Sequence, residues 1–123
     1  MTTLFASVFL AAAASTNPWL AEWNTPYGMP PFNELKVSEY VDAIKKGCEL
    51  KQKRIKLIVE NKEEPTFKNT IVPYIFADKE LTQASRVFGV LFSLERDEER
   101  EKASIEAIPI FTADTAKTIS NRE

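Results

Sequence analysis

The sequence predicts an all-α protein: a helical hairpin or three antiparallel helices, preceded by an extended arm rich in proline and aromatic residues. Apolar residues recur at a spacing of three to four over long stretches, as on one face of a helix. The sequence contains no Asn-Gly or Asp-Gly turn and no sustained alternation of apolar and polar residues, so that it shows no sign of a β-hairpin. The composition, 44% hydrophobic and 28% charged over 123 residues, is typical of one globular domain.

These patterns divide the chain into three regions. Residues 1–15 are mostly apolar or small, residues 16–37 form the arm, and residues 38–123 carry the helical pattern. Within the first region, Leu4–Ala14 has eleven apolar or small residues, which is too short to span a bilayer. No other segment approaches membrane length.

The apolar N-terminal region matches a signal peptide in length, and its alanine run offers cleavage sites. No lysine or arginine precedes Lys36, which argues against that interpretation. Export to the periplasm is nevertheless slightly favoured. An apolar helical start or a disordered tail of a cytoplasmic protein remains the alternative.

The arm combines backbone restriction with large apolar side chains. Its prolines fix φ and favour extended backbone in the preceding residue. Because aromatic side chains bury large apolar areas, we expect the arm to pack on the helices. A ligand-stacking platform is the alternative. The aromatic residues of the arm are Trp19, Trp23, Tyr27 and Phe32, and the alternative concerns the first three.

The first helix is predicted from Ser38 to about Asn61, with Ser38 as its N-cap and Glu39 in its first turn. Gly47 lies mid-helix and costs about 1 kcal/mol relative to alanine, which a closely packed neighbouring helix would explain. The basic run Lys51–Arg54 is interpreted as a solvated face. The apolar positions of this helix are Tyr40, Val41, Ile44, Cys48, Ile55, Ile58 and Val59.

A second helix is predicted after Pro65, with Thr66 as its N-cap and an apolar run from Phe67 to about Leu94. Pro73 lies inside this run and predicts a kink or an opened turn. The apolar positions are Ile71, Ile75, Leu81, Ala84, Val87, Phe88, Leu91 and Phe92.

The C-terminal part is less regular. The charged stretch Leu94–Glu101 is either a loop or the start of a third helix. A weaker helical run extends from Ser104 to Ile119 and is interrupted by Pro109. Its apolar positions are Ile105, Ile108, Phe111 and Ile119.

The residues themselves predict no catalytic, cofactor-binding or metal-binding site. The chain has no histidine, which excludes a Ser-His-Asp triad and the usual zinc sites. Cys48 is the one cysteine, and without a histidine base we interpret it as a small apolar residue. The acidic residues Asp97, Glu98 and Glu99 are interpreted as a solvated face or a helix start, in preference to a metal site. With a net charge of −2 and three glycines, neither nucleic-acid binding nor a phosphate loop is indicated.

Two motifs carry further information. The first is Asn17-Pro18-Trp19, followed by Trp23–Gly28 (WNTPYG) and Pro30-Pro31-Phe32, and the second is Pro65–Ile71 (PTFKNTI). Together they resemble the N-terminal region of the bacterial peptidyl-dipeptidase and oligopeptidase A family of zinc metallopeptidases, which includes the thimet oligopeptidases. The first motif is most similar to the peptidyl-dipeptidases. Further matching positions are Tyr40, Ala43, Gly47, Ser85, Val87, Phe88, Leu91, Ile108 and Pro109.

The second motif also suits structural roles. Pro65 ends the first helix, and Thr66 caps the next one. Phe67 is expected to wedge between the two helices, and Asn69 is expected to return a hydrogen bond toward the cap.

The resemblance implies a helical segment that forms one wall and the lid of a deep channel admitting short peptides. The family's zinc site is an H-E-x-x-H helix with a further glutamate, and no residue of this sequence matches it. Zinc, the catalytic domain and the release of C-terminal dipeptides are therefore expected of a longer parent enzyme. The chain is interpreted as the N-terminal helical domain of such a peptidase, truncated or encoded separately, and not catalytic alone.

Two other interpretations stay open: a free-standing helical interaction module, and an unrelated enzyme that relies only on carboxylates. The peptidase interpretation makes a structural prediction of its own. The helices should expose apolar surface that the remainder of the enzyme would cover. Monomeric behaviour with a sharp cooperative melt would count against it.

Overall fold

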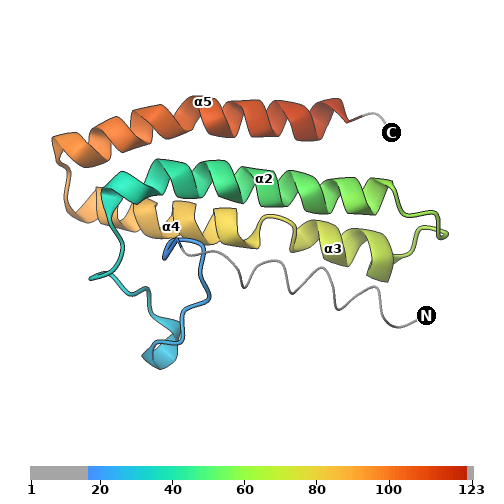
Figure 1. The fold of residues 1–123 in the computed structure, drawn as a ribbon, viewed down its shortest axis with the longest axis horizontal. Helices are drawn as coiled ribbons and strands as arrows, with labels where there is room; N and C mark the ends of the chain where they lie inside the picture. Colours follow the sequence, from blue (N-terminus) through green and yellow to red (C-terminus); the bar gives the residue numbers. More distant parts are fainter. Residues whose placement is uncertain (1–16, 122–123) are drawn as a thin grey trace.

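The computed structural model describes residues 17–121, and within this range it is helical with no strand, as predicted. The prediction of a signal peptide falls outside the described residues. In Figure 1 the successive long helices alternate in direction, so that α2 and α5 run the same way and α4 runs oppositely. The elements are η2 (Pro26–Gly28), η3 (Val37–Glu39), α2 (Tyr40–Val59), η4 (Phe67–Ile71), α3 (Val72–Ile75), α4 (Lys79–Leu94) and α5 (Glu98–Ser120).

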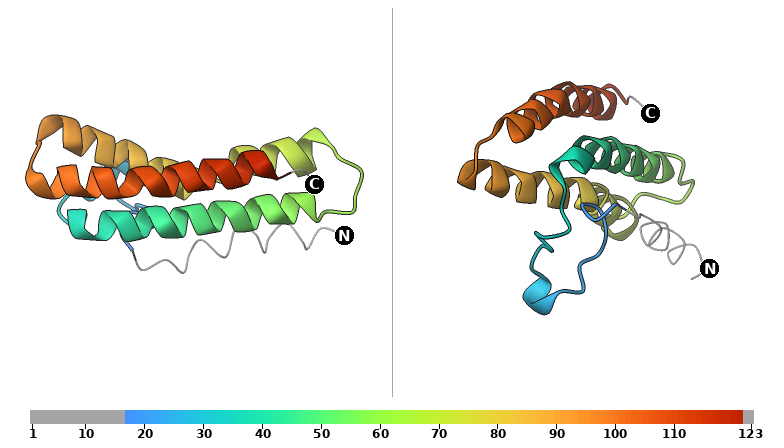
Figure 2. Two further views of the ribbon diagram at one scale, coloured as in Figure 1. Left: turned by 90° about the horizontal axis from the view of Figure 1, so that it is seen from above. Right: turned by 60° about the vertical axis from the view of Figure 1, so that its left-hand side comes forward.

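Helix α2 is the central element, because it contacts α4 on one side and α5 on another (Figure 2). The buried core lies along these two contacts and includes the base of the arm. Its residues from the arm are Trp19, Leu20 and Leu35, those from α2 are Tyr40, Ala43, Ile44 and Cys48, and those from α4 and α5 are Leu81, Ala84, Phe88, Ala103 and Ala107. Partly buried residues such as Val87, Phe92 and Phe111 pack against this core.

The start of the first helix differs from the prediction. Ser38 is not the N-cap, because it lies inside the short 3-10 helix η3. There the N–H of Tyr40 donates to the carbonyl of Val37, and the N–H of Glu39 donates to Lys36 at 3.1 Å. Backbone carbonyls therefore satisfy the first donors, and a side-chain cap is not required.

Gly47 has a close neighbour on another helix, which is one of the explanations that the sequence left open. A Cβ atom placed on this glycine would lie 3.2 Å from both Cα and Cβ of Leu81 on α4. This distance is tighter than ordinary van der Waals contact, and the backbone of Leu81 cannot move without moving α4. The glycine therefore permits the close approach of α2 and α4.

We predict opposite effects for alanine at the two helical glycines. Gly47→Ala should lower the free energy of unfolding by about 1 kcal/mol, because the clash with α4 outweighs the gain in helix propensity. Gly89→Ala is the matched control, because nothing lies within 4 Å of a Cβ there. It should stabilise the protein by up to about 1 kcal/mol. Urea unfolding measures both, and equal stabilisation by the two substitutions would contradict the close approach.

The predicted second helix is divided into three segments. Thr66 and Asn69 form the expected capping box: the hydroxyl of Thr66 accepts from the N–H of Asn69 at 3.1 Å, and the Asn69 side chain accepts from the N–H of Thr66 at 2.7 Å. The opened turn predicted near Pro73 is the π-helix η4, which precedes it. A second break, between Ile75 and Lys79, was not predicted.

Two further expectations for the helices are wrong. Phe67 does not wedge between helices, since 70% of its surface is exposed. Pro109 does not interrupt the third helix, because α5 continues through it. The carbonyl that loses its helical donor belongs to Ile105, an exposed residue, so that water can satisfy it. Asp97 caps α5 by accepting from the N–H of Arg100 at 2.8 Å, which agrees with an acidic helix start.

Candidate docking surface

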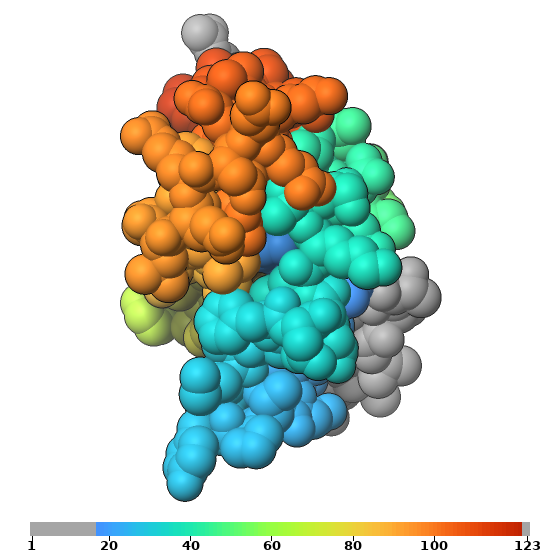
Figure 3. Space-filling model, turned by 90° about the vertical axis from the view of Figure 1, so that its left-hand side faces the viewer, coloured from blue at the N-terminus to red at the C-terminus, as the bar shows by residue number. Residues whose placement is uncertain are grey.

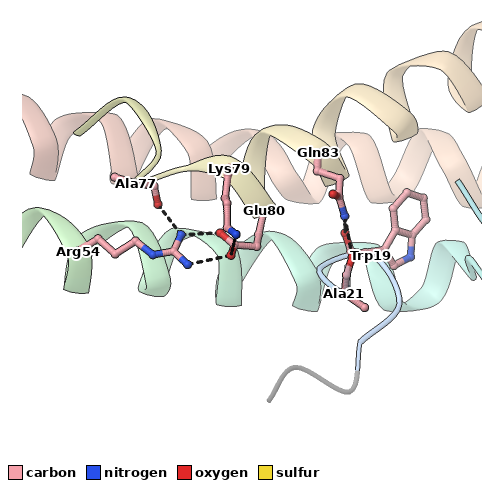
Figure 4. A network of polar contacts seen from close by, with 7 residues as sticks. All are labelled: Trp19, Ala21, Arg54, Ala77, Lys79, Glu80 and Gln83. Atoms are coloured by element: carbon pink, nitrogen blue, oxygen red, sulfur yellow. Dashed lines mark hydrogen bonds and ion pairs between the residues drawn. The ribbon is translucent and has the colours of Figure 1, made fainter. Parts of the chain in front are cut away.

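The base of the arm is fixed firmly to the helices, as predicted for Trp19. The Trp19 indole is completely buried and lies edge-on to the ring of Tyr40, with 5.3 Å between the centroids. Its N–H donates to the carbonyl of Lys36 at 2.9 Å. From α4, the amide of Gln83 donates to the carbonyls of Trp19 and Ala21 at 3.2 Å and 3.0 Å (Figure 4).

The tip of the arm behaves differently. Tyr27 is 101% exposed and Phe32 is 45% exposed, so the prediction that these rings pack on the helices is wrong. Tyr27 also has φ +60°, a region that residues with a side chain seldom occupy. In Figure 3 the arm, in blue at the bottom of the view, projects away from the helices. The aromatic motif is thus divided between an anchored base and a free tip.

A buried ion pair joins α2 to the first turn of α4, directly after the break. The guanidinium of Arg54 donates to both carboxylate oxygens of Glu80 at 2.5 Å and 2.8 Å, and to the carbonyl of Ala77 at 3.0 Å (Figure 4). Burial alone would raise the pKa of Glu80, but the hydrogen bonds and charge of Arg54, together with a backbone hydrogen bond and the charge of Lys79, outweigh it and lower the pKa below its usual value. The contact therefore holds the break between α3 and α4 in place.

A second buried pair joins α2 to α5. The ammonium of Lys51 lies 2.6 Å from the Asp114 carboxylate, and the amide of Gln52 donates to Asp114 at 2.7 Å and to Thr118 at 3.0 Å. The interpretation of the run Lys51–Arg54 as a solvated face is therefore wrong, with Lys53 as its exposed member.

No role was predicted from the sequence for the two carboxylates of these pairs, Glu80 and Asp114. A signal was present in the spacing. Glu80 comes four residues before Ala84, and Asp114 comes seven residues after Ala107, so that each falls on an apolar stripe of its helix. A charge on such a stripe needs a partner of opposite charge when the stripe is buried.

A shallow groove of about 570 Å³ lies between α2 and α5. It is lined by Cys48 together with lysines, Pro109, Ile110 and Asp114. Burial, followed by the charge of Asp114, raises the pKa of the Cys48 thiol to about 11. The thiol is therefore protonated at neutral pH and is a buried apolar residue, as the sequence indicated, with no features of a nucleophile.

The described residues do not fit the zinc that the resemblance implies. Between residues 17 and 121, no three acidic or cysteine side chains come close enough to hold a metal ion. The chain also has no histidine. In the same range, no helix is both long and apolar enough to cross a membrane.

The most distinctive surface is an apolar stripe on η4 and α3, called the α3 patch. Five large apolar residues in ten positions are between 43% and 70% exposed there: Phe67, Ile71, Tyr74, Ile75 and Phe76. Spacings of three and four place most of them on one helical face, which in a folded protein usually faces a core. Other exposed apolar residues on α4 and α5 are Val90, Leu94, Ile105, Ile108 and Ile119. The expected uncovered apolar surface is present.

Within residues 17–121, the structure is helical and has a solvent-exposed apolar face at the α3 patch. The chain is 28% identical over 86 residues to the dipeptidyl carboxypeptidase of Escherichia coli strain K12. The match covers 70% of this chain and spans 13% of the length of that relative, so the relation to the peptidase is distant. No family model matches the chain. No solved structure matches it either.

Proposed function

We propose that this chain is the N-terminal helical segment of a peptidyl-dipeptidase-like zinc peptidase. It contributes to the wall and lid of the peptide channel and is not catalytic by itself. The observation that carries the proposal is the α3 patch, a helical stripe that faces solvent instead of a core. The similarity to the E. coli dipeptidyl carboxypeptidase supports the choice of partner, because most of that protein lies outside the match.

The patch suits packing against further polypeptide because its position is defined. The capping box of Thr66 and Asn69 begins η4, and Arg54 holds the carbonyl of Ala77 where α3 ends. Both ends of the segment are thus fixed before any partner binds. A preorganised apolar surface loses little conformational entropy on association. Zinc and the groups that bind it belong, in this proposal, to the part of the peptidase that packs on the patch.

Co-expression with a partial relative tests the proposal. This chain is produced together with the E. coli dipeptidyl carboxypeptidase from which the matching segment has been removed. We expect the two to purify as a one-to-one complex that releases dipeptides from a peptide substrate in a zinc-dependent manner. The chain alone should release none.

Two substitutions locate the contact. Ile75→Glu, in the exposed α3 patch, should abolish retention of the truncated peptidase, because a charge would be desolvated in the apolar contact. Lys68→Glu is the matched control at an exposed polar position of the same segment and should leave retention unchanged. Absence of binding to soluble truncated peptidase, or dipeptide release by the chain alone, would contradict the proposal.

A further inference from the structure

The tip of the arm presents a surface that the helices do not use. Tyr27 is fully exposed, and Met29 and Phe32 beside it are about half exposed. From Trp23 to Asn33 the sequence has no charged residue, although 28% of the whole chain is charged. An uncharged, aromatic projection of this kind leaves apolar area in water that a partner can cover.

The tip keeps its shape through its own hydrogen bonds. The N–H of Gly28 donates to the carbonyl of Thr25 at 3.0 Å, and the N–H of Met29 donates to Pro26 at 3.3 Å. The hydroxyl of Thr25 donates to the carbonyl of Met29. These bonds hold Tyr27 at φ +60° with its ring away from the protein. The strained backbone thus serves to present the ring, and a loop that is already ordered loses little entropy on binding.

We propose that the arm tip, residues 24–33, inserts the ring of Tyr27 into an uncharged, apolar recess of the polypeptide that completes the peptidase. This inference rests on the proposed function and adds a second contact to the α3 patch. The absence of charge on the tip selects a recess without charged groups. The recess would be formed by the rest of such a peptidase, because the match spans only 13% of the length of the E. coli relative.

The anchored base makes this contact specific. Trp19 fixes the arm to α2 and α4, because its buried ring contacts Tyr40 and Phe88 and its carbonyl accepts from Gln83. The tip and the α3 patch are therefore parts of one packed unit. When two rigid surfaces of one chain bind the same partner, the first contact holds the second surface close to its binding site. The second contact therefore strengthens binding without a further loss of conformational entropy.

The test compares three forms of the full chain. Tyr27→Gly removes the ring, and glycine adopts φ +60° without strain. Tyr27→Phe keeps the ring and is the matched control. Each is measured for its dissociation constant toward the E. coli dipeptidyl carboxypeptidase that lacks the matching segment. We expect Tyr27→Gly to bind at least about tenfold more weakly and Tyr27→Phe to stay within about threefold. The urea midpoint of the isolated Tyr27→Gly chain should be unchanged or higher.

Each other outcome is decisive. If the wild-type chain binds and Tyr27→Gly binds equally well, the inference is overturned while the proposed function stands. If the wild-type chain does not bind soluble truncated peptidase, both fall. A lower urea midpoint for Tyr27→Gly would show that the ring stabilises the chain itself. A dimer of the isolated chain that Tyr27→Gly dissociates would identify a second copy as the occupant, which also overturns the inference.

Discussion

Trp19→Ala is expected to lower the free energy of unfolding by about 3–5 kcal/mol, which is the usual cost of removing a buried tryptophan. The indole is fully buried and contacts the rings of Tyr40 and Phe88, at centroid distances of 5.3 Å and 6.3 Å. Tyr40 and Phe88 are themselves stacked at 3.7 Å, so that the arm and two helices meet in one aromatic cluster. Removing the indole leaves a cavity at the centre of that cluster.

Urea unfolding followed by far-ultraviolet circular dichroism measures the effect, since tryptophan fluorescence would change with the substitution itself. Trp19→Phe is the matched control. It keeps a ring but loses the N–H bond to Lys36, so it should cost less than Trp19→Ala. A loss below about 1 kcal/mol for Trp19→Ala would show that the arm is peripheral to the fold.

Glu80→Gln is expected to cost about 3–5 kcal/mol at pH 7, because it leaves the guanidinium of Arg54 buried without a counter-charge. Glu80 is 5% exposed, so that water screens the pair little. The double substitution Arg54→Met with Glu80→Met should recover most of the loss, since it removes both charges together. Glu60→Gln is the control: its ion pair with Lys56 spans 3.6 Å at the surface, and the expected change is within about 0.5 kcal/mol.

The same pair predicts a pH dependence with a definite sign. The pKa of Glu80 is lower in the folded chain than its ordinary value of about 4.3. Its contribution to stability is therefore fully present above about pH 5, and it is lost as the pH falls through the folded pKa. Wild-type stability should fall in acid more steeply than that of Glu80→Gln, whose residue 80 cannot titrate. Parallel curves for the two proteins below pH 5 would contradict this account.

Most of the helices and one of their contacts are predictable from local pattern. The capping box of Thr66 and Asn69 follows from residue types three positions apart, and the structure confirms it. A close helix neighbour was one explanation of the costly mid-helix Gly47, and Leu81 is such a neighbour. Both features depend on a few adjacent residues or on one helix face, which a sequence displays directly.

The docking surface was only partly predictable. Uncovered apolar area was expected, but its place was not: the α3 patch lies just before the break between Ile75 and Lys79, which was not predicted either. No residue between Ile75 and Lys79 predicts a break, whereas Pro73 predicted the opened turn that the structure shows as a π-helix. The sequence of the arm likewise does not distinguish its buried from its exposed aromatic residues, although Trp19 is buried and Tyr27 is fully exposed.

The sequence alone determined that the chain is helical, where the capping box of Thr66 and Asn69 lies, and that its own residues carry no histidine-based chemistry. These properties depend on local hydrogen bonding, on the 3.6-residue period and on residue type. Only the tertiary structure decided which charges are buried and which rings are free. The partners of Arg54 and Lys51 lie on other helices, so that their pairing depends on how α2, α4 and α5 are rotated against one another.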